Sequence, residues 1–259
     1  MNAILPLSQV VLKEMYRRKD FYVLFVLTVV LTLAAGSANF FNEDRIVAYI
    51  KDLSLLLIWV AALVIAIVTT ARQIPAERES RTIFPLLAKP LTRWQFLLGK
   101  FAGCWFTCGL ALVVFYFFFA VICGTREHQM PLLQYLQALW LQWMMLGVVV
   151  ALVLLGSILF SAPSANATIS LVVVFGILLL GRHLGKVALQ QEEPARSLVY
   201  TLYFLIPHLE WYDVRDLLIY NQPLIAWLDV GLATLYAAAY ALFFLFATWL
   251  LFRRKSLSL

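Results

Sequence analysis

Long apolar stretches alternate with short polar segments along most of the chain. Six of these stretches run for 18 or more residues with almost no charged side chain. A helix of about 20 apolar residues crosses the roughly 30 Å hydrocarbon core with its backbone groups bonded internally, so each stretch predicts a transmembrane helix. The predicted spans are residues 21–38, 53–71, 101–123, a part of 132–161, 167–185 and a part of 224–252.

The composition agrees with this pattern and excludes an ordinary soluble domain. Apolar residues make up 63% of the chain and charged residues 13%, and the mean hydropathy is +0.88. Too little polar surface remains to cover a water-soluble fold. We therefore predict an all-α integral membrane protein in which residues 1–259 form a single transmembrane domain.

The distribution of basic residues predicts the orientation in the membrane. With a cytoplasmic N-terminus, 13 of the 20 Lys and Arg residues lie on the cytoplasmic side. The positive-inside rule and the even number of spans then place both termini in the cytoplasm. The net charge of +6 follows from this asymmetry and from contact with anionic lipid, so it does not indicate a nucleic-acid partner.

Residues 1–20 are predicted to form a helix that lies in the inner membrane interface. Apolar residues recur at near-helical spacing between positions 7 and 15, and Lys13 and Arg17 share a more polar side. A plain charged flank of the first span is the alternative interpretation.

Three shorter features predict how the spans are connected and packed. Residues 39–52 read as a polar outer loop, and residues 161–167 read as a tight inner turn. Gly99, Gly103 and Thr107 follow at four-residue spacing and form a ridge of small side chains. Such a ridge allows another helix to approach closely.

The longest run of charged and turn-forming residues between two predicted spans is residues 72–95. Pro75 suits the first turn of a helix, where a missing N–H group has no cost. Glu77 and Glu79 suit the same turn because the helix dipole is positive there. We therefore predict a short helix from about residue 75 to residue 84.

Two further signals follow within this segment. Pro85 and Pro90 each disfavour helical geometry in the residue before them, so the short helix should end near Pro85. Thr92 and Gln95 have the spacing of a capping box, in which each side chain bonds the backbone N–H of the other residue. The next helix is therefore predicted to begin at this point and to continue into the third span.

The sequence ERESRTIFPLLAKPLTRWQFLLGK, residues 77–100, resembles the cytoplasmic loop of ABC transporter permeases of the type-2 (ABC-2) export family. Members of that family carry an acidic residue, a Gly-Thr-Ile-like turn, a Leu-Leu-x-Lys-Pro run, Ser/Thr-Arg-Trp and Leu-Gly-Lys. The matching positions here are Glu79, Thr82, Ile83, Leu86, Leu87, Lys89, Pro90, Thr92, Arg93, Trp94, Leu98, Gly99 and Lys100. Arg81 departs from the usual glycine, and Pro85 departs from the usual helix former.

This resemblance implies a function for the segment of residues 72–95. In the family the loop is a coupling helix that sits in a cleft of a separate ATP-hydrolysing subunit. The residues that would contact this ATPase are Glu77, Glu79, Arg81, Thr82, Ile83, Phe84 and Leu87. ATP and magnesium would be bound by the partner subunit, so the resemblance implies no catalytic residue, cofactor or metal site in this chain.

The resemblance also implies the assembly and its location. The chain would be the membrane-spanning permease subunit of an ATP-driven exporter in a prokaryotic plasma (inner) membrane. A second permease copy or a homologue would complete the membrane part, and two ATPase subunits would drive it. A periplasmic partner is a further expectation for the outer loop.

Polar residues in the fourth predicted span suggest a substrate path. Gln137 and Gln142 lie close to Trp140 and Trp143 in the sequence. Tryptophan favours the membrane interface, which predicts that these glutamines lie near the outer surface of the bilayer. Polar residues inside a membrane commonly face a cavity, so Gln137 and Gln142 are also candidates for the lining of a path.

Residues 185–223 form the largest predicted outer region. Residues 197–206 are apolar enough to re-enter the membrane, and residues 207–220 resemble the short helices that cap the outer mouth of the same permeases. Trp211 and Tyr212 are expected at the membrane interface, where they are candidates for an outer gate. The neighbouring charged residues are expected on a solvated face, and these are Asp213, Arg215 and Asp216.

Two other functions are compatible with parts of the sequence. A permease-like subunit that does not transport could transmit ATP-driven motion to an extracytoplasmic partner in metal-site maturation or in cell-surface machinery. An intramembrane protease is the other alternative, because residues 192–196 partly match the Glu-Glu-x-x-x-Arg signature of CAAX-type membrane proteases. Their arginine is one residue too close, and Pro194 interrupts the helix that would align the two carboxylates.

Overall fold

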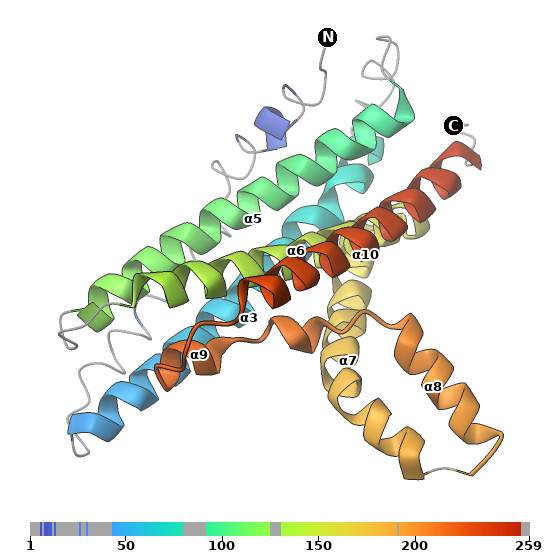
Figure 1. Ribbon diagram of the computed structural model, residues 1–259. Coiled ribbons are helices and arrows are strands. Elements are labelled where there is room, and N and C mark those ends of the chain that lie inside the picture. Colours follow the sequence, from blue (N-terminus) through green and yellow to red (C-terminus); the bar gives the residue numbers. More distant parts are fainter. Residues whose placement is uncertain are drawn as a thin grey trace.

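The computed structural model describes residues 6, 8–11, 13, 26, 30, 43–79, 92–124, 131–190 and 192–254 (Figure 1). In this part of the chain, all regular secondary structure is helical. The helices are α3 (Glu43–Glu79), α5 (Arg93–Gly124), α6 (Leu132–Leu159), α7 (Pro163–Gln190), α8 (Ala195–Leu205), the 3-10 helix η1 (Leu209–Tyr212), α9 (Arg215–Ile219) and α10 (Trp227–Arg254).

Five of the described helices are long and apolar enough to cross a membrane. These five segments are Lys51–Glu77, Arg93–Val121, Leu132–Leu159, Pro163–Gly181 and Trp227–Arg254. They correspond to the second through sixth predicted spans. The first predicted span, residues 21–38, lies outside the described residues apart from positions 26 and 30. The predicted interfacial helix at residues 1–20 is described only at residues 6, 8–11 and 13, which are helical.

Helix α6 is the centre of the bundle. In an apolar stretch of 18 residues within α6, 72% of the residues are buried, whereas the corresponding shares in α7 and α10 are 28% each. Residues 144–151 are buried one after another, so this helix is enclosed on all its sides. An all-round apolar sequence suits such a position, because no face of the helix needs contact with water. Helices α3, α5 and α10 pack around α6, and the half of α7 that leads to α8 leaves the bundle (Figure 1).

A reciprocal tryptophan contact holds α5 against α6. The indole Nε1 of Trp105 donates a hydrogen bond to the Trp143 carbonyl (3.0 Å), and the indole Nε1 of Trp143 donates one to the Trp105 carbonyl (3.0 Å). The two rings stack with centroids 4.7 Å apart. Gly109 and Gly147 make room for these rings, since a Cβ at either glycine would lie within 3.0 Å of an indole nitrogen. Trp143 thus packs two helices together, although the sequence suggested an interfacial residue.

The small-residue ridge on α5 packs against the N-terminal segment. A Cβ at Gly103 would lie 2.8 Å from the Cβ of Val11 and 3.1 Å from the Cα of Ser8. Val11 is only 2% exposed. The prediction of close packing along this ridge is therefore confirmed at Gly103.

The bundle has two ends, which are called here the loop end and the cap end. The loop end carries Glu79, Arg93, Leu159, Pro163 and Arg254, which are terminal residues of α3, α5, α6, α7 and α10. The cap end carries the opposite termini of α3, α5, α6 and α10 together with α9, whereas the far end of α7 lies outside the bundle (Figure 1). Successive long helices run in opposite directions between the two ends, as expected for consecutive spans joined by short connections.

Two predicted connections are wrong in the structure. Residues 43–52 are helical, because α3 begins at Glu43 inside the stretch predicted as a polar loop. Residues 163–167 are helical as well, because α7 begins at Pro163 and leaves only residues 160–162 as the turn. Pro163 fits the first helical position, where no backbone N–H is required.

The expected helix start at Pro75 is also wrong, because α3 runs through Pro75 without a break. A proline inside a helix removes the hydrogen bond to the carbonyl four residues earlier, which here belongs to Ala71. The side-chain amide of Asn166 supplies this bond from α7, with its Nδ2 3.3 Å from the Ala71 oxygen. The helix therefore continues through Pro75 because a neighbouring helix bonds the carbonyl that the proline leaves open.

Candidate coupling segment and ligand pocket

The structure describes the predicted ATPase-contact residues only in part. Glu77 and Glu79 lie at the end of the described part of α3. The other predicted contacts lie outside the described residues, and these are Arg81, Thr82, Ile83, Phe84 and Leu87. The described parts of the site are the stretches of α3 and α5 that precede and follow residues 80–91.

The capping box at the start of α5 is confirmed. The backbone N–H of Gln95 donates to Oγ1 of Thr92 (3.2 Å), and the backbone N–H of Thr92 donates to Oε1 of Gln95 (3.1 Å). Helix α5 begins at Arg93, directly after the Thr92 cap. Both bonds use N–H groups at the helix start that have no partner within the helix, so they fix the point where the chain enters α5.

A buried ion pair joins the two helices that flank residues 80–91. The Lys100 ammonium on α5 pairs with the Glu77 carboxylate on α3 and donates a hydrogen bond to Oε1 of Gln73 (3.0 Å). The Lys100 side chain is 3% exposed and that of Glu77 is 17% exposed. Because a charge buried in an apolar bundle is stable only when it is paired, this contact fixes the last turn of α3 against α5.

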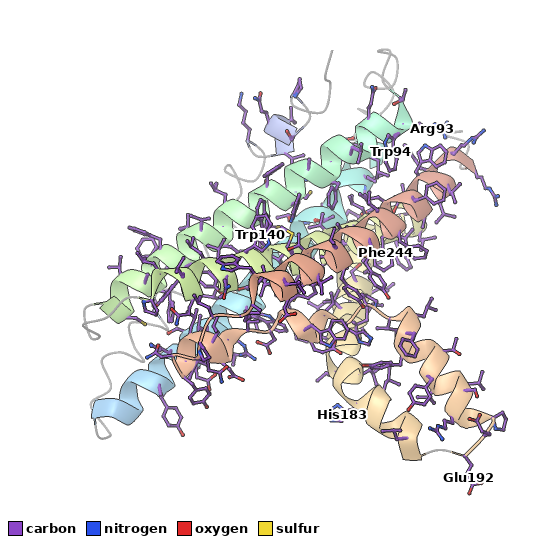
Figure 2. All side chains as sticks on the ribbon, in the orientation of Figure 1. Arg93, Trp94, Trp140, His183, Glu192 and Phe244 are labelled. Atoms are coloured by element: carbon purple, nitrogen blue, oxygen red, sulfur yellow. The ribbon has the colours of Figure 1, made fainter. Side chains whose placement is uncertain are left out.

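The end of α10 completes the loop end of the bundle. Nη1 of Arg93 donates to the carbonyls of Phe252 (2.5 Å) and Arg253 (3.2 Å), which are in the last turn of α10. The carbonyl end of a helix attracts a cation. Trp94 meets Trp249 edge to face at 6.4 Å between centroids. Figure 2 shows Arg93 and Trp94 beside this end of α10.

At the cap end, Gln137 and Gln142 are both buried. Nε2 of Gln137 donates to the Ile225 carbonyl (2.9 Å), and its Oε1 accepts from the Ile225 N–H (3.1 Å). Gln142 accepts from the Tyr116 hydroxyl (2.9 Å). Gln137 therefore fixes the segment that leads into α10. The assignment of Gln137 and Gln142 to a substrate path stays a prediction.

Trp211 and Tyr212 have different surroundings although they are neighbours on η1. Tyr212 is 1% exposed, and its hydroxyl donates to the Ala233 carbonyl (2.7 Å), so Tyr212 packs inside the protein, and its place at the membrane interface stays a prediction. Burial raises the pKa of the Tyr212 hydroxyl well above its ordinary value. Trp211 is 56% exposed. The assignment of these two residues to an outer gate stays a prediction.

The expected solvated face next to η1 is correct for Asp216 and wrong for Asp213 and Arg215. Arg215 donates from Nε to Oδ1 of Asp213 (2.7 Å) and from Nη2 to Oδ2 (3.0 Å), and the two side chains are 23% and 10% exposed. The hydrogen bonds to Asp213 raise the pKa of Arg215 above its ordinary value. The guanidinium also lies 5.6 Å from the ring centroid of Trp59 on α3. The ion pair orders the cap segment itself, and the contact of Arg215 with Trp59 joins this segment to α3.

Lys51 makes a second connection between α3 and the cap. Its side chain is 2% exposed, and its Nζ donates to the Leu218 carbonyl on α9 (3.1 Å) and to Oδ1 of Asn221 (3.4 Å). The short helices expected in residues 207–220 are thus present as η1 and α9. They lie against α3, α6 and α7.

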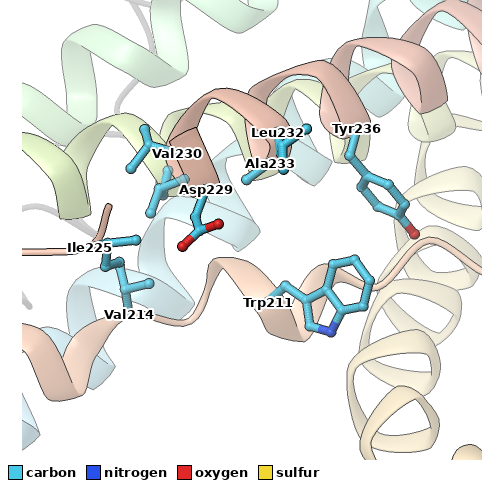
Figure 3. Close-up of a pocket in the computed structure, with 9 residues that line it drawn as sticks. Trp211, Val214, Ile225, Asp229, Val230, Leu232, Ala233 and Tyr236 are labelled. Atoms are coloured by element: carbon cyan, nitrogen blue, oxygen red, sulfur yellow. The ribbon is translucent and has the colours of Figure 1, made fainter. Parts of the chain in front are cut away.

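A pocket of about 440 Å³ lies between η1, α6 and the first turns of α10 (Figure 3). Its lining residues are mostly apolar, and they include the rings of Trp211 and Tyr236 and the carboxylate of Asp229. The residues that line it are Leu141, Trp211, Val214, Ile225, Asp229, Val230, Leu232, Ala233 and Tyr236. Trp211 is the one predicted site residue among them.

Sequence reasoning missed a row of aromatic side chains that begins at this pocket with Trp211 and Tyr236. Tyr236, Tyr240 and Phe244 repeat every four residues on α10, and successive ring centroids are 4.8 and 6.3 Å apart. Trp211 meets Tyr236 at 5.3 Å and His208 at 4.7 Å. The four-residue spacing is a signal that was present in the sequence, since such residues share one face of a helix.

The described fold defines the class of an all-helical membrane protein with several spans. Residues 7–257 match the family described as "ABC-2 family transporter protein", and the chain therefore belongs to this family. The match covers nearly the whole chain, so it confirms the resemblance that residues 77–100 suggested. The search of curated proteins gave no match. Membrane components of this family typically have no catalytic activity of their own.

Proposed function

We propose that this chain is the permease subunit of an ATP-driven exporter and that residues 80–91 dock into a separate ATPase subunit. The observation that carries the proposal is the pair of fixed helix ends on either side of this segment. Lys100 and Glu77 connect these ends directly, and the Thr92 cap sets the entry into α5. A movement applied to residues 80–91 would therefore shift α3 and α5 together.

The orientation in this proposal follows from charge. Six of the described basic residues lie within seven residues of the loop end along their helices, namely Arg72, Arg78, Arg93, Lys100, Arg253 and Arg254. The positive-inside rule then assigns the loop end to the cytoplasm, where ATP is available. ATP and magnesium would be bound by the partner subunit in the plasma membrane complex.

A second permease copy or a homologue would complete the transporter. Helices α7 and α10 support this assembly because each exposes large apolar residues along its length. On α10 they include Leu228, Leu232, Leu235 and Phe243, each at least 56% exposed. Lipid and a second permease both suit such faces, and pairing of two permeases would cover part of them.

The experiment is co-expression with the P-loop ATPase encoded beside the gene for this chain, followed by purification through a tag on the permease. We expect a stable complex whose ATPase activity differs from that of the ATPase alone. Glu79→Ala and Phe84→Ala should weaken this effect on ATP hydrolysis. Glu192→Gln is the control, because Glu192 is exposed between α7 and α8, far from the loop end (Figure 2).

Two results would contradict the proposal. The first is the absence of a complex with any ATPase encoded nearby. The second is a complex in which Glu79→Ala and Phe84→Ala hydrolyse ATP as the unsubstituted complex does, because docking through residues 80–91 would then have no function.

Mechanical transmission without transport is the second candidate function. It is favoured by α8, which leaves the bundle together with the end of α7 and exposes Leu198, Phe204 and Leu205 by 68% or more. Such a surface suits a partner outside the cytoplasm. Crosslinking from position 198 in intact cells should capture one specific extracytoplasmic protein under this function, whereas pure transport predicts only lipid or a second permease.

A further inference from the structure

We infer that the pocket between η1 and α10 binds an amphipathic organic cation, such as a quaternary ammonium or a protonated amine on an apolar body. Its volume of about 440 Å³ is within the range of ~300–1,000 Å³ that is usual for small-molecule sites. The inference concerns a ligand of this chain alone and does not depend on an ATPase. It therefore goes beyond the proposed coupling function.

The first observation is the Asp229 carboxylate. It forms no ion pair and no side-chain hydrogen bond with the described residues, and in Figure 3 it points into the space between α10 and the segment that carries Val214. An acid in the first turn of a helix is favoured by the helix dipole, so this position alone indicates no ligand. Here the carboxylate also lines a largely apolar pocket, in which it is the only charged group.

The second observation is the aromatic surface at the other side of the pocket. Trp211 and Tyr236 both line it, with ring centroids 5.3 Å apart. Aromatic faces attract cations through the negative potential above the ring, and tryptophan does so most strongly. Asp229 and Tyr236 are seven residues apart on α10, so they share one face and lie about 10 Å apart along the axis. One extended ligand can therefore reach both groups.

The third observation is the balance of charge around the pocket. Arg215, a cation of the cap next to the lining residue Val214, is already paired with both carboxylate oxygens of Asp213. No basic side chain lines the pocket itself. An anionic ligand would thus meet Asp229 without a compensating charge, whereas a cation would find a partner. The pocket therefore favours cationic over anionic ligands, and its apolar lining favours ligands with an apolar body.

The test compares two ions of nearly the same size and shape and opposite charge. Binding of tetraphenylphosphonium and of tetraphenylborate is measured separately by equilibrium dialysis of the full chain in uncharged maltoside micelles, with protein-free micelles as the blank. We expect saturable binding of tetraphenylphosphonium at one site per chain and at least tenfold weaker binding of tetraphenylborate.

The variants locate the site. Asp229→Asn should weaken the binding of tetraphenylphosphonium about fivefold, the loss expected for one solvent-accessible ion pair. Trp211→Leu should weaken it about threefold through loss of the cation–π contact. Asp216→Asn is the matched control, because it removes one negative charge from the same end of the molecule without touching the pocket, and it should leave the affinity unchanged.

Competition separates a free cation from a lipid headgroup that carries the same chemistry. If only dodecyltrimethylammonium displaces tetraphenylphosphonium, the ligand is a soluble cation. If dihexanoylphosphatidylcholine displaces it as well, the ligand is a choline headgroup. Both results support the site. Equal binding of the two tetraphenyl ions, no saturable binding, or equal effects of Asp229→Asn and Asp216→Asn would overturn the inference. None of these results would affect the coupling to an ATPase, which is measured by ATP hydrolysis.

Discussion

The side-chain amide of Asn166 on α7 bonds the carbonyl of Ala71 on α3, which is the carbonyl that Pro75 cannot bond within its own helix. Asn166 is fully buried. The same Nδ2 group lies 2.9 Å from Oγ of Ser157 on α6, so one asparagine connects three helices. Polar bonds of this kind hold helices together where the surroundings are apolar on every side.

We predict that Asn166→Ala destabilises the protein by about 1–3 kcal/mol, because it leaves the Ala71 carbonyl and Ser157 without their amide partner. Pro75→Ala restores a backbone N–H at the position that can bond Ala71. In a protein that already carries Pro75→Ala, Asn166→Ala should therefore lower the free energy of unfolding by a smaller amount. Thermal unfolding in detergent, followed by size-exclusion chromatography, measures both effects. If the effects of the two substitutions on stability were strictly additive, the Asn166 amide would not compensate for the hydrogen bond that Pro75 cannot make to the Ala71 carbonyl.

A second prediction concerns the ion pair at the loop end. Lys100→Met removes the cation that pairs with the partly buried Glu77, so it should lower the free energy of unfolding by about 3 kcal/mol. Lys100→Met combined with Glu77→Gln should recover a part of this loss, because a neutral amide then replaces the carboxylate that Lys100 faced. The same thermal assay measures the three variants. If Lys100→Met alone were as stable as the double variant, the ion pair would have no structural role.

The spans were predictable from the sequence because the bilayer imposes one strong rule on length and polarity. Every predicted span that the structure describes is present as a helix. Thr92 and Gln95 were predictable for a similar reason, since a capping box depends only on residues within one turn. Local rules of this kind determine where a helix begins when no distant residue interferes.

The predictions that failed concern partners that are distant in the sequence. Pro75 was expected to begin a helix because the Asn166 amide, 95 residues away from Ala71, could not be foreseen. The burial of Tyr212 could not be foreseen either, because its sequence neighbours do not show the Ala233 carbonyl that its hydroxyl meets. Propensity and patterning describe one helix at a time, and tertiary contacts decide which polar group finds a partner.

The third prediction tests the packing between α5 and α6. Gly109→Ala places a Cβ 2.6 Å from Nε1 of Trp143, so it should displace the indole and break its bond to the Trp105 carbonyl. We expect a loss of about 1–3 kcal/mol, as for overpacking in other well-packed cores. Gly231→Ala on α10 is the matched control, because nothing lies within 4 Å of its added Cβ.

The control should be neutral or should stabilise the protein, since alanine favours helices over glycine by up to about 1 kcal/mol. Tryptophan fluorescence and thermal unfolding are the measurements. A stable Gly109→Ala protein with unchanged tryptophan emission would contradict the close fit of the two rings.

The last prediction separates a structural role of Gln137 from a role in transport. The NH2 group and the carbonyl oxygen of the Gln137 amide both bond the backbone of Ile225, so Gln137→Leu should leave two partly buried backbone groups without these partners. We expect a loss of about 2–3 kcal/mol and increased proteolysis in the segment before α10. Gln134→Leu is the control, since Gln134 lies one turn earlier and bonds the Gln222 carbonyl at an exposed site. Its effect should stay within about 0.5 kcal/mol. If Gln137→Leu were as stable as the unsubstituted protein and yet lost transport, Gln137 would line the path and would not serve mainly to anchor α10.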